Sequence, residues 1–242
     1  MKRWTFLGVS AIAVAILLGG CGLIHPVVGS GRLESQSYGL AGFTRLEASN
    51  AFVVKLVPDT RFSVLVTSDN NLGALLIVEK TGPDTLRLAL DPSHTYVGVT
   101  VRAEVHMPAV ASIDASGASS VTATQSFAQG ISTSVTLSGA SLLTLSYLSC
   151  SDLTLDLSGA STATIAGLTG NETVTASGGS HANIVGCAGT QANVDLSGAS
   201  DATVNAQAIT LTASGASTLY YLGSPAIVTR DLSGGSRIVN VN

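Results

Sequence analysis

Four aspartates stand at matching positions of a repeated sequence, and they are the residues whose type and spacing could perform chemistry. They are Asp114, Asp156, Asp195 and Asp231. Two carboxylates held about 6.5–9.5 Å apart are the arrangement that inverting glycoside hydrolases use. Spaced carboxylates with Ser and Thr oxygens are also ligands that Ca²⁺ accepts. Either chemistry depends on what the repeat places around these side chains.

The unit that carries the aspartates is the tetrapeptide Ser-Gly-(Ala/Gly)-Ser, which occurs seven times. Copies begin at Ser116, Ser138, Ser158, Ser177, Ser197, Ser214 and Ser233. A spacing of about 20 residues is too short for two helices and a turn, but it fits one coil of a β-solenoid. The coils of such a fold stack at the strand spacing of about 4.8 Å.

Alternating apolar and polar residues on both sides of each copy predict two strands per coil. One and three residues before the first Ser, the side chains are apolar in every copy except for Arg230 in the last one. Five and seven residues after that Ser, the first six copies again have apolar or aromatic side chains. Period-two alternation is typical of strands with one buried face. The tetrapeptide is then a corner, where Gly adopts a positive φ without steric cost.

The aspartates occupy the polar column two residues before each corner, where they alternate with threonines. The column reads Asp114, Thr136, Asp156, Thr175, Asp195, Thr212 and Asp231. Stacked neighbouring aspartates would repel one another, and an intervening threonine doubles their separation. We interpret the column as a structural ladder that faces solvent and offers a candidate ligand-facing surface. A catalytic site would interrupt a repeat, and residues 103–229 contain no Lys or Arg to bind an acidic polysaccharide.

Other candidate sites have weaker signals. The Gly- and Asp-rich nonapeptide of calcium-binding β-rolls is absent, so we predict no metal site. We also predict no cofactor and no catalytic residue. His181 has no second His or Cys at ligand spacing and is interpreted as a surface histidine. A partial threonine face that could order water is interrupted by Asn183.

The first 21 residues have the features of an exported lipoprotein. Lys2 and Arg3 precede an apolar run at residues 4–18 that is too short to span a bilayer comfortably. The run ends in Leu-Gly-Gly before Cys21, which resembles the lipobox at which bacterial lipoproteins are acylated, with palmitate among the acyl chains. We predict a signal peptide over residues 1–20, lipidation of Cys21 and a lipid-anchored tether over residues 21–37. Acyl chains would hold the protein on a membrane, and Gly22 in place of Asp favours the outer membrane or cell surface.

The remaining chain is predicted to form an N-terminal β region over residues 38–110 and the repeat solenoid over residues 111–242. Candidate strands of the β region are residues 43–47, 52–57, 62–67, 75–79, 85–90 and 97–106. Cys150 and Cys187 fall in coils with a whole coil between them. Their Cα atoms would be about 9–10 Å apart, beyond disulfide reach, so both are predicted to be free, buried thiols. Asp231, Arg237 and residues 240–242 are candidates for a C-terminal cap.

Several stretches together resemble one bacterial family. They are Gly-Ser-Gly at 29–31, Phe43 before a strand, Ser-Asp-Asn at 68–70, and VRAEVHMPAVASIDASGAS at 101–119. The family is the "putative auto-transporter adhesin, head GIN domain" family, DUF2807, and the resemblance covers roughly residues 38–240. It implies an all-β, single-stranded right-handed parallel β-helix on an exported protein, often a lipoprotein. It brings no catalytic residues.

Composition and charge narrow the function classes. Acidic residues outnumber basic ones, 15 to 11, and no basic patch is visible, so nucleic acid is not a predicted partner. We predict a non-enzymatic lipoprotein with an adhesin-like domain that contacts the membrane through its lipid and binds a glycan or an envelope protein. The alternatives are a polysaccharide-active β-helix enzyme and a purely structural envelope protein. An enzyme would need a non-repeating cluster of acid, base and cation, and the sequence displays none.

Overall fold

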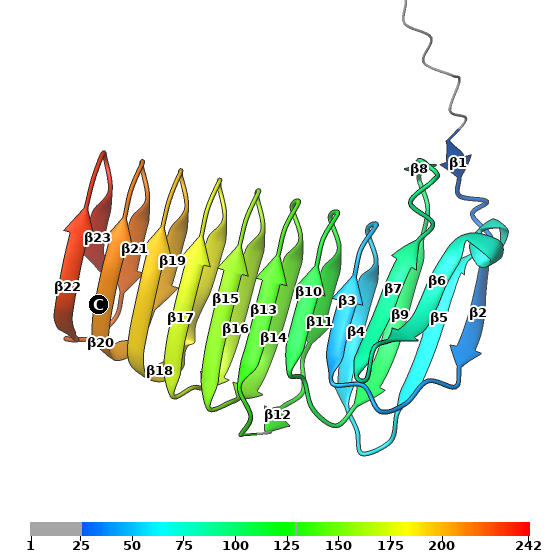
Figure 1. The fold of residues 1–242 in the computed structure, drawn as a ribbon, viewed down its shortest axis with the longest axis horizontal. Helices are drawn as coiled ribbons and strands as arrows, with labels where there is room; N and C mark the ends of the chain where they lie inside the picture. Colours follow the sequence, from blue (N-terminus) through cyan, green and yellow to red (C-terminus); the bar gives the residue numbers. More distant parts are fainter. Residues whose placement is uncertain (1–25, 129) are drawn as a thin grey trace, which may run out of the picture.

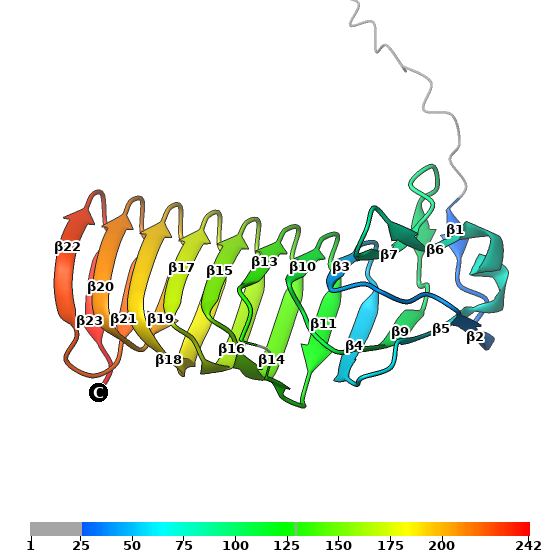
Figure 2. The same cartoon turned by 60° about the horizontal axis from the view of Figure 1, so that its bottom comes forward.

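The protein is an elongated β-solenoid in the computed structural model, which describes residues 26–128 and 130–242 (Figures 1 and 2). About six turns stack in parallel, roughly 20 residues apart, which confirms the predicted fold class and coil length. Among the described residues, no helix is long and apolar enough to cross a membrane. The predicted signal peptide and Cys21 lie outside the described residues.

Each coil contributes strands to two sheets that face one another across the core. The first sheet contains, in spatial order, β2 (Leu33–Tyr38), β5 (Ser63–Asp69), β9 (Val101–Met107), β4 (Val53–Pro58), β11 (Ser120–Ala123), β14 (Leu142–Ser149), β16 (Thr162–Leu168), the start of β18 (His181–Leu196), β19 (Asp201–Val204), β21 (Thr218–Tyr221) and β23 (Arg237–Asn240). The second contains β6 (Leu76–Thr81), β7 (Thr85–Leu90), β3 (Arg45–Ala48), β10 (Ser112–Ala115), β13 (Thr133–Leu137), β15 (Asp152–Leu157), β17 (Asn171–Ala176), the end of β18, β20 (Ala206–Ala213) and β22 (Ala226–Leu232). The short strand β12 (Phe127–Ala128) pairs with β14, and the 3₁₀ helix η1 (Asn70–Leu75) follows β5.

The repeated tetrapeptide forms the corner between the two sheets. In the first six copies its last Ser is buried and donates a hydrogen bond to the carbonyl of its first Ser, at 2.7 Å from Ser119 to Ser116 and at 2.9 Å from Ser161 to Ser158. The Gly between them has a positive φ in every copy. Successive corners stack so closely that a Cβ on Gly159 would lie 3.1 Å from the backbone nitrogen of the Gly one coil earlier. The Ser, Gly and Ser positions are therefore each explained by packing or hydrogen bonding at the corner.

The central peptide of the corner changes its direction partway along the solenoid. In the first two copies both central residues have positive φ, and the amide of Ala118 donates forward to the carbonyl of Gly139 at 2.9 Å. From Gly159 onward only the Gly has positive φ, and the amide of Gly179 donates backward to the carbonyl of Gly159 at 2.8 Å. The two arrangements correspond to the φ patterns of type I′ and type II′ turns, which differ by a flip of this peptide.

The N-terminal end has a different topology. Strands β7 and β9 form a coil that packs outside β3 and β4, although they follow them in the chain. Antiparallel strands β5, β2 and β6 then close this end. Between β3 and β4, Ser49-Asn50-Ala51-Phe52 occupies the corner position without a glycine, and the amide of Ala51 donates to the carbonyl of Gly117 at 2.9 Å. This region therefore contains a corner that lacks the tetrapeptide sequence.

Each of the six predicted strands of the β region has a counterpart in the structure, with two differences. The run 97–106 is divided into β8 (Tyr96–Val97) and β9, because Gly98 turns the chain with a positive φ. The predicted tether, residues 21–37, overlaps β1 (Val27–Val28) and most of β2, which pair with β8 and β5. Backbone pairing therefore fixes residues 27–28 and 33–37 of this segment. The rest of the domain division stays a prediction.

One apolar cluster fills the space between the two sheets along the whole solenoid. Cys150 and Cys187 are buried in it and are not joined by a disulfide, as the coil spacing predicted. Burial raises the pKa of Cys150 to about 11 and that of Cys187 to about 12, so both thiols stay protonated at neutral pH. Glu172 also lies in the interior, fully buried, with one carboxylate oxygen accepting from the Thr169 hydroxyl at 2.7 Å.

The C-terminal coil ends the stack with exposed strands. Arg230 takes the register position opposite Leu211 but is exposed, because no further coil covers it within the described residues. Of the predicted cap residues, Asn240 and Asn242 bond to the backbone of Gly223. Arg237 donates from Nε to the hydroxyl of Thr218 at 3.2 Å. These contacts tie the end of the chain to the preceding coil.

Candidate functional site

The aspartate column forms a continuous row on the outer face of the second sheet. Strand register places Asp114, Thr136, Asp156, Thr175, Asp195, Thr212 and Asp231 side by side in that order, and all are exposed. The row continues into the N-terminal coils through Glu47 and then Arg87. We call these nine side chains the ladder. Whether it binds a ligand stays a prediction.

The alternation of acid and threonine fails where the repeat meets the N-terminal region. Glu47 lies directly beside Asp114 with no neutral residue between them. The two side chains line a hollow of about 200 Å³ together with Arg87, which also pairs with Glu79 at 3.9 Å. Partial burial raises the pKa of Asp114. This end of the ladder therefore has paired acids and a cation in one depression.

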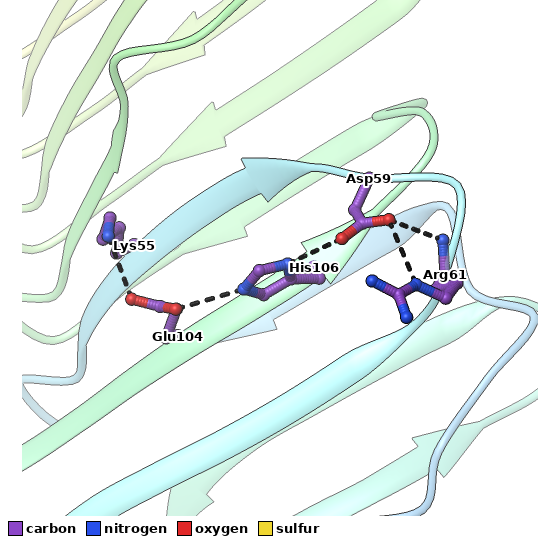
Figure 3. Close-up of polar contacts among 5 residues, drawn as sticks. All are labelled: Lys55, Asp59, Arg61, Glu104 and His106. Carbon is purple, nitrogen blue, oxygen red and sulfur yellow. Dashed lines mark hydrogen bonds and ion pairs between the residues drawn. The ribbon is translucent and has the colours of Figure 1, made fainter.

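A second group of charged side chains lies on the first sheet. It is at the edge away from the corners, where β4 and β9 end (Figure 3). Glu104 and His106 are two residues apart on β9 and so point to the same face. Lys55 is the register partner of Glu104 on β4, and Asp59 and Arg61 follow β4 in the loop to β5. We call these five residues the His106 cluster.

Contacts in the His106 cluster alternate in charge from one end to the other (Figure 3). Lys55 Nζ lies 2.9 Å from Glu104 Oε2, and Glu104 Oε1 lies 3.1 Å from His106 Nε2. His106 Nδ1 lies 3.2 Å from Asp59 Oδ2. Asp59 Oδ1 accepts from the Arg61 amide at 3.0 Å, and the Arg61 Nε lies 3.8 Å away.

These contacts favour the doubly protonated imidazolium. The carboxylate of Glu104 is the largest influence that raises the pKa of His106, and that of Asp59 adds to it. In return, the hydrogen bond from His106 lowers the pKa of Glu104, with Lys55 contributing, and the Arg61 amide lowers that of Asp59. Because both ring nitrogens donate to carboxylates, neither is available as a base or a metal ligand.

A hollow of about 310 Å³ beside the cluster is lined by Asp59, Arg61, Phe62, Ser63 and His106. Ser63 is the register partner of His106, so Ser, His and Asp share one depression. They do not form a catalytic triad, because the nitrogen that would take the Ser proton is already bonded to Glu104. The hollow offers polar and charged groups to a ligand.

The prediction that the protein has no non-repeating cluster of acid, base and cation is wrong, because the His106 cluster is one. Its members lie up to about fifty positions apart in the sequence, and only strand order brings them together. The one sequence signal is the Glu-Val-His alternation at 104–106, which places two titratable side chains on one face. His181, predicted as a lone surface histidine, is exposed but contacts Asp201 of the next coil through Nδ1. Within the described residues, no group of three or more His, Cys, Asp or Glu side chains is placed to hold a metal ion.

The fold agrees with comparisons to known proteins. The family model described as "Putative auto-transporter adhesin, head GIN domain" matches residues 42–225, so the chain belongs to the DUF2807 family. No curated protein matches the sequence.

Solved structures of proteins from Bacteroides and Parabacteroides species have the same fold. A "putative adhesin" from Bacteroides fragilis has a TM-score of 0.73 at 19% identity, covering 89% of this chain and 100% of its own. A "putative adhesin" from Parabacteroides distasonis has a TM-score of 0.69 at 20% identity, covering 90% and 100%. A "putative lipid binding protein" from the same species has a TM-score of 0.68 at 14% identity, with the same coverages. At these identities the likeness shows the fold alone.

Proposed function

We propose that this protein is a non-enzymatic, exported lipoprotein whose solenoid binds a polar polymer of the cell envelope or of another surface, in the manner of an adhesin. The observation that carries the proposal is the ladder, an exposed polar row that keeps its register through every repeat coil. A polymer with a regular repeat of hydroxyl or amide groups can contact such a row at many points. Many weak contacts in series add up to useful avidity.

The family and the solved structures support the same class of protein. Family membership and neighbours described as adhesins fit an exported protein that binds rather than catalyses. The "putative lipid binding protein" adds a lipid as a further kind of ligand for this fold. The lipobox-like sequence before Cys21 supports attachment to a membrane, with the outer membrane or cell surface as the favoured location.

The alternative of a polysaccharide-active enzyme has one observation in its favour. Asp59, Ser63 and His106 share a hollow at the end of the first sheet. The two carboxylates on His106 argue against it, because they favour the protonated ring and occupy both of its nitrogens. Release of reducing sugar from polysaccharides by the wild type, absent in a His106→Gln variant, would favour the enzyme over the binding protein.

A glycan array tests the binding proposal. Full-length protein in detergent micelles is compared with a variant in which the four ladder aspartates are changed to asparagine. A control variant changes outward threonines of the first sheet to serine, at Thr122, Thr144, Thr164 and Thr203. We expect binding by the wild type and the control and at least a tenfold loss in the asparagine variant. Equal binding by all three, with matching circular dichroism spectra, would remove the ladder from the binding surface.

Lipidation is tested separately in cells. Growth with an alkyne analogue of palmitate should label the wild-type protein, and Cys21→Ser should abolish the labelling. The Cys150→Ser variant is the matched control, because its thiol is buried in the folded protein. Equal labelling of wild type and Cys21→Ser would contradict the anchor.

A further inference from the structure

Strands β1 and β8 form a small parallel ribbon that stands apart from the two main sheets. Val27 pairs with Tyr96 and Val28 with Val97. The first pair is partly buried against the core, whereas Val28 is 58% and Val97 51% exposed. Two valines held side by side in water form a small apolar patch at the tip of a projecting element. The exposed pair has no role in the packing of the solenoid.

The ribbon is fixed firmly to the body. The buried carboxylate of Asp69 accepts hydrogen bonds from the amides of Gly31 and Thr100, each at 2.7 Å. The Asn71 amide group donates to the carbonyl of Val28 at 2.9 Å. A Cβ on Gly29 would lie 2.4 Å from the Gly98 carbonyl, so the two segments touch. The valine pair therefore has a set orientation relative to the solenoid.

The ribbon lies at the edge where the chain enters the described structure, and the corners lie along the same edge (Figures 1 and 2). Cys21 precedes Val27, the first residue of the ribbon, by six residues, and six extended residues span at most about 22 Å. A lipid on Cys21 thus keeps the ribbon within that distance of the bilayer. The repeated corner tetrapeptides on this edge contain no charged residue, whereas the loop with Asp59 and Arg61 lies at the opposite edge.

We propose that the β1–β8 ribbon docks on the lipid bilayer beside the anchored N-terminus, with Val28 and Val97 at the boundary between headgroups and acyl chains. The proposal rests on the membrane anchoring in the proposed function and names the surface that anchoring brings to the lipid. The acyl chains on Cys21 hold the protein at one point, and a second apolar contact would set the orientation of the solenoid on the bilayer. Docking by this edge turns the His106 cluster away from the membrane.

Tryptophan fluorescence tests the docking. Trp4 is the only tryptophan in the sequence, so a Trp4→Phe background carrying Val97→Trp reports on the ribbon alone. The matched control carries Val228→Trp on β22 at the far end, where Val228 is 65% exposed. Each full-length protein is reconstituted into vesicles of phosphatidylethanolamine and phosphatidylglycerol, with and without brominated acyl chains.

We expect the tryptophan at position 97 to emit at shorter wavelength and to lose at least half of its intensity to the brominated lipid, while that at position 228 changes little. Equal quenching and equal emission at both positions would overturn the docking. Mass spectrometry of the same samples reports acylation of Cys21. If Cys21 is unmodified, the apolar run at residues 4–18 still holds the chain on the vesicle. The docking of the ribbon is then still measured, so lipidation of Cys21 and docking can fail independently.

Discussion

The N-terminal region and the repeat coils build the same two-sheet solenoid by different means. Among the described residues, every ion pair except that of His181 with Asp201 lies before residue 107, and every antiparallel strand pair lies there as well. The repeat coils instead depend on glycine corners, buried serines and an apolar interior. Regular stacking thus replaces side-chain pairing, and the irregular end is where chemically distinct clusters arise.

The largest effect is expected where the repeat coils rely on glycine. Gly167 has a φ of +150°, and a Cβ there would lie 1.7 Å from the Leu148 carbonyl oxygen. Gly167→Ala should lower the free energy of unfolding by about 3 kcal/mol or more, because strain and clash add. Urea denaturation measures this. Gly223→Ala is the control, since its φ is +75° with nothing near its Cβ, and about 1 kcal/mol is expected. Similar losses in both variants would show that close stacking is unimportant.

The next effect concerns the buried acid of the repeat coils, which has no cation beside it. Burial raises the pKa of Glu172 to about 7, and its Oε2 has no hydrogen-bond partner among the described residues. The unfolded pKa is about 4.3, so the folded state holds the proton more tightly and stability falls as pH rises from about 4.5 to 7. Glu172→Gln should be about 2 kcal/mol more stable than wild type at about pH 8 and similar at about pH 4.5.

Urea denaturation at the two pH values measures this difference. Glu79→Gln, at an exposed position of β6, is the control and should differ from wild type by the same small amount at both pH values. Wild-type stability that is constant between about pH 4.5 and 8 would contradict the prediction.

The third effect belongs to the N-terminal region, where the contacts of His106 stabilise the charged form of a half-buried group instead of the neutral form. The raised pKa of His106 means that its contribution is fully present below the unfolded value of about 6.5 and is lost as pH rises through the folded value. Because the side chains are accessible to water, the contribution is about 0.5–1 kcal/mol. NMR titration of the His106 ring should show a raised pKa, which Glu104→Gln lowers more than Asp59→Asn. The reverse order would mean that Asp59 is the stronger partner.

The smallest effect tests the charge alternation of the ladder. Thr175→Asp places a carboxylate between Asp156 and Asp195 and should cost about 0.5 kcal/mol at low salt. At about 1 M NaCl the cost should vanish through screening. Thermal unfolding at both salt concentrations measures it. The control is Thr173→Asp on the same strand, whose register neighbours Thr154 and Asn193 are uncharged. Equal loss in the two variants would mean that the alternation has no electrostatic role.

The contrast between the two regions also explains what could be predicted from the sequence. Repetition exposes register directly, so the ladder, the corners and the buried columns follow from aligning copies. The corner at 49–52 could not be predicted, because Asn50 and Ala51 adopt positive φ without a glycine. The hydrogen bond from the Ala51 amide to the Gly117 carbonyl of the neighbouring corner supports this conformation. The His106 cluster depends on β9 returning beside β4, a topology that no local pattern records.

The change in corner direction leaves a seam in the solenoid. Corners up to Gly139 send their central amide toward the C-terminal end, and those from Gly159 send it toward the N-terminal end. At the junction the amides of Ala140 and Ala160 converge, and neither has a hydrogen-bond partner among the described residues. The corner peptides thus form two rows whose N–H groups point in opposite directions. The rows meet at this junction with their N–H ends facing each other. Two converging donors at an exposed position suit a shared oxygen, such as that of a water molecule, so the corner edge has a polar junction that its repeated sequence conceals.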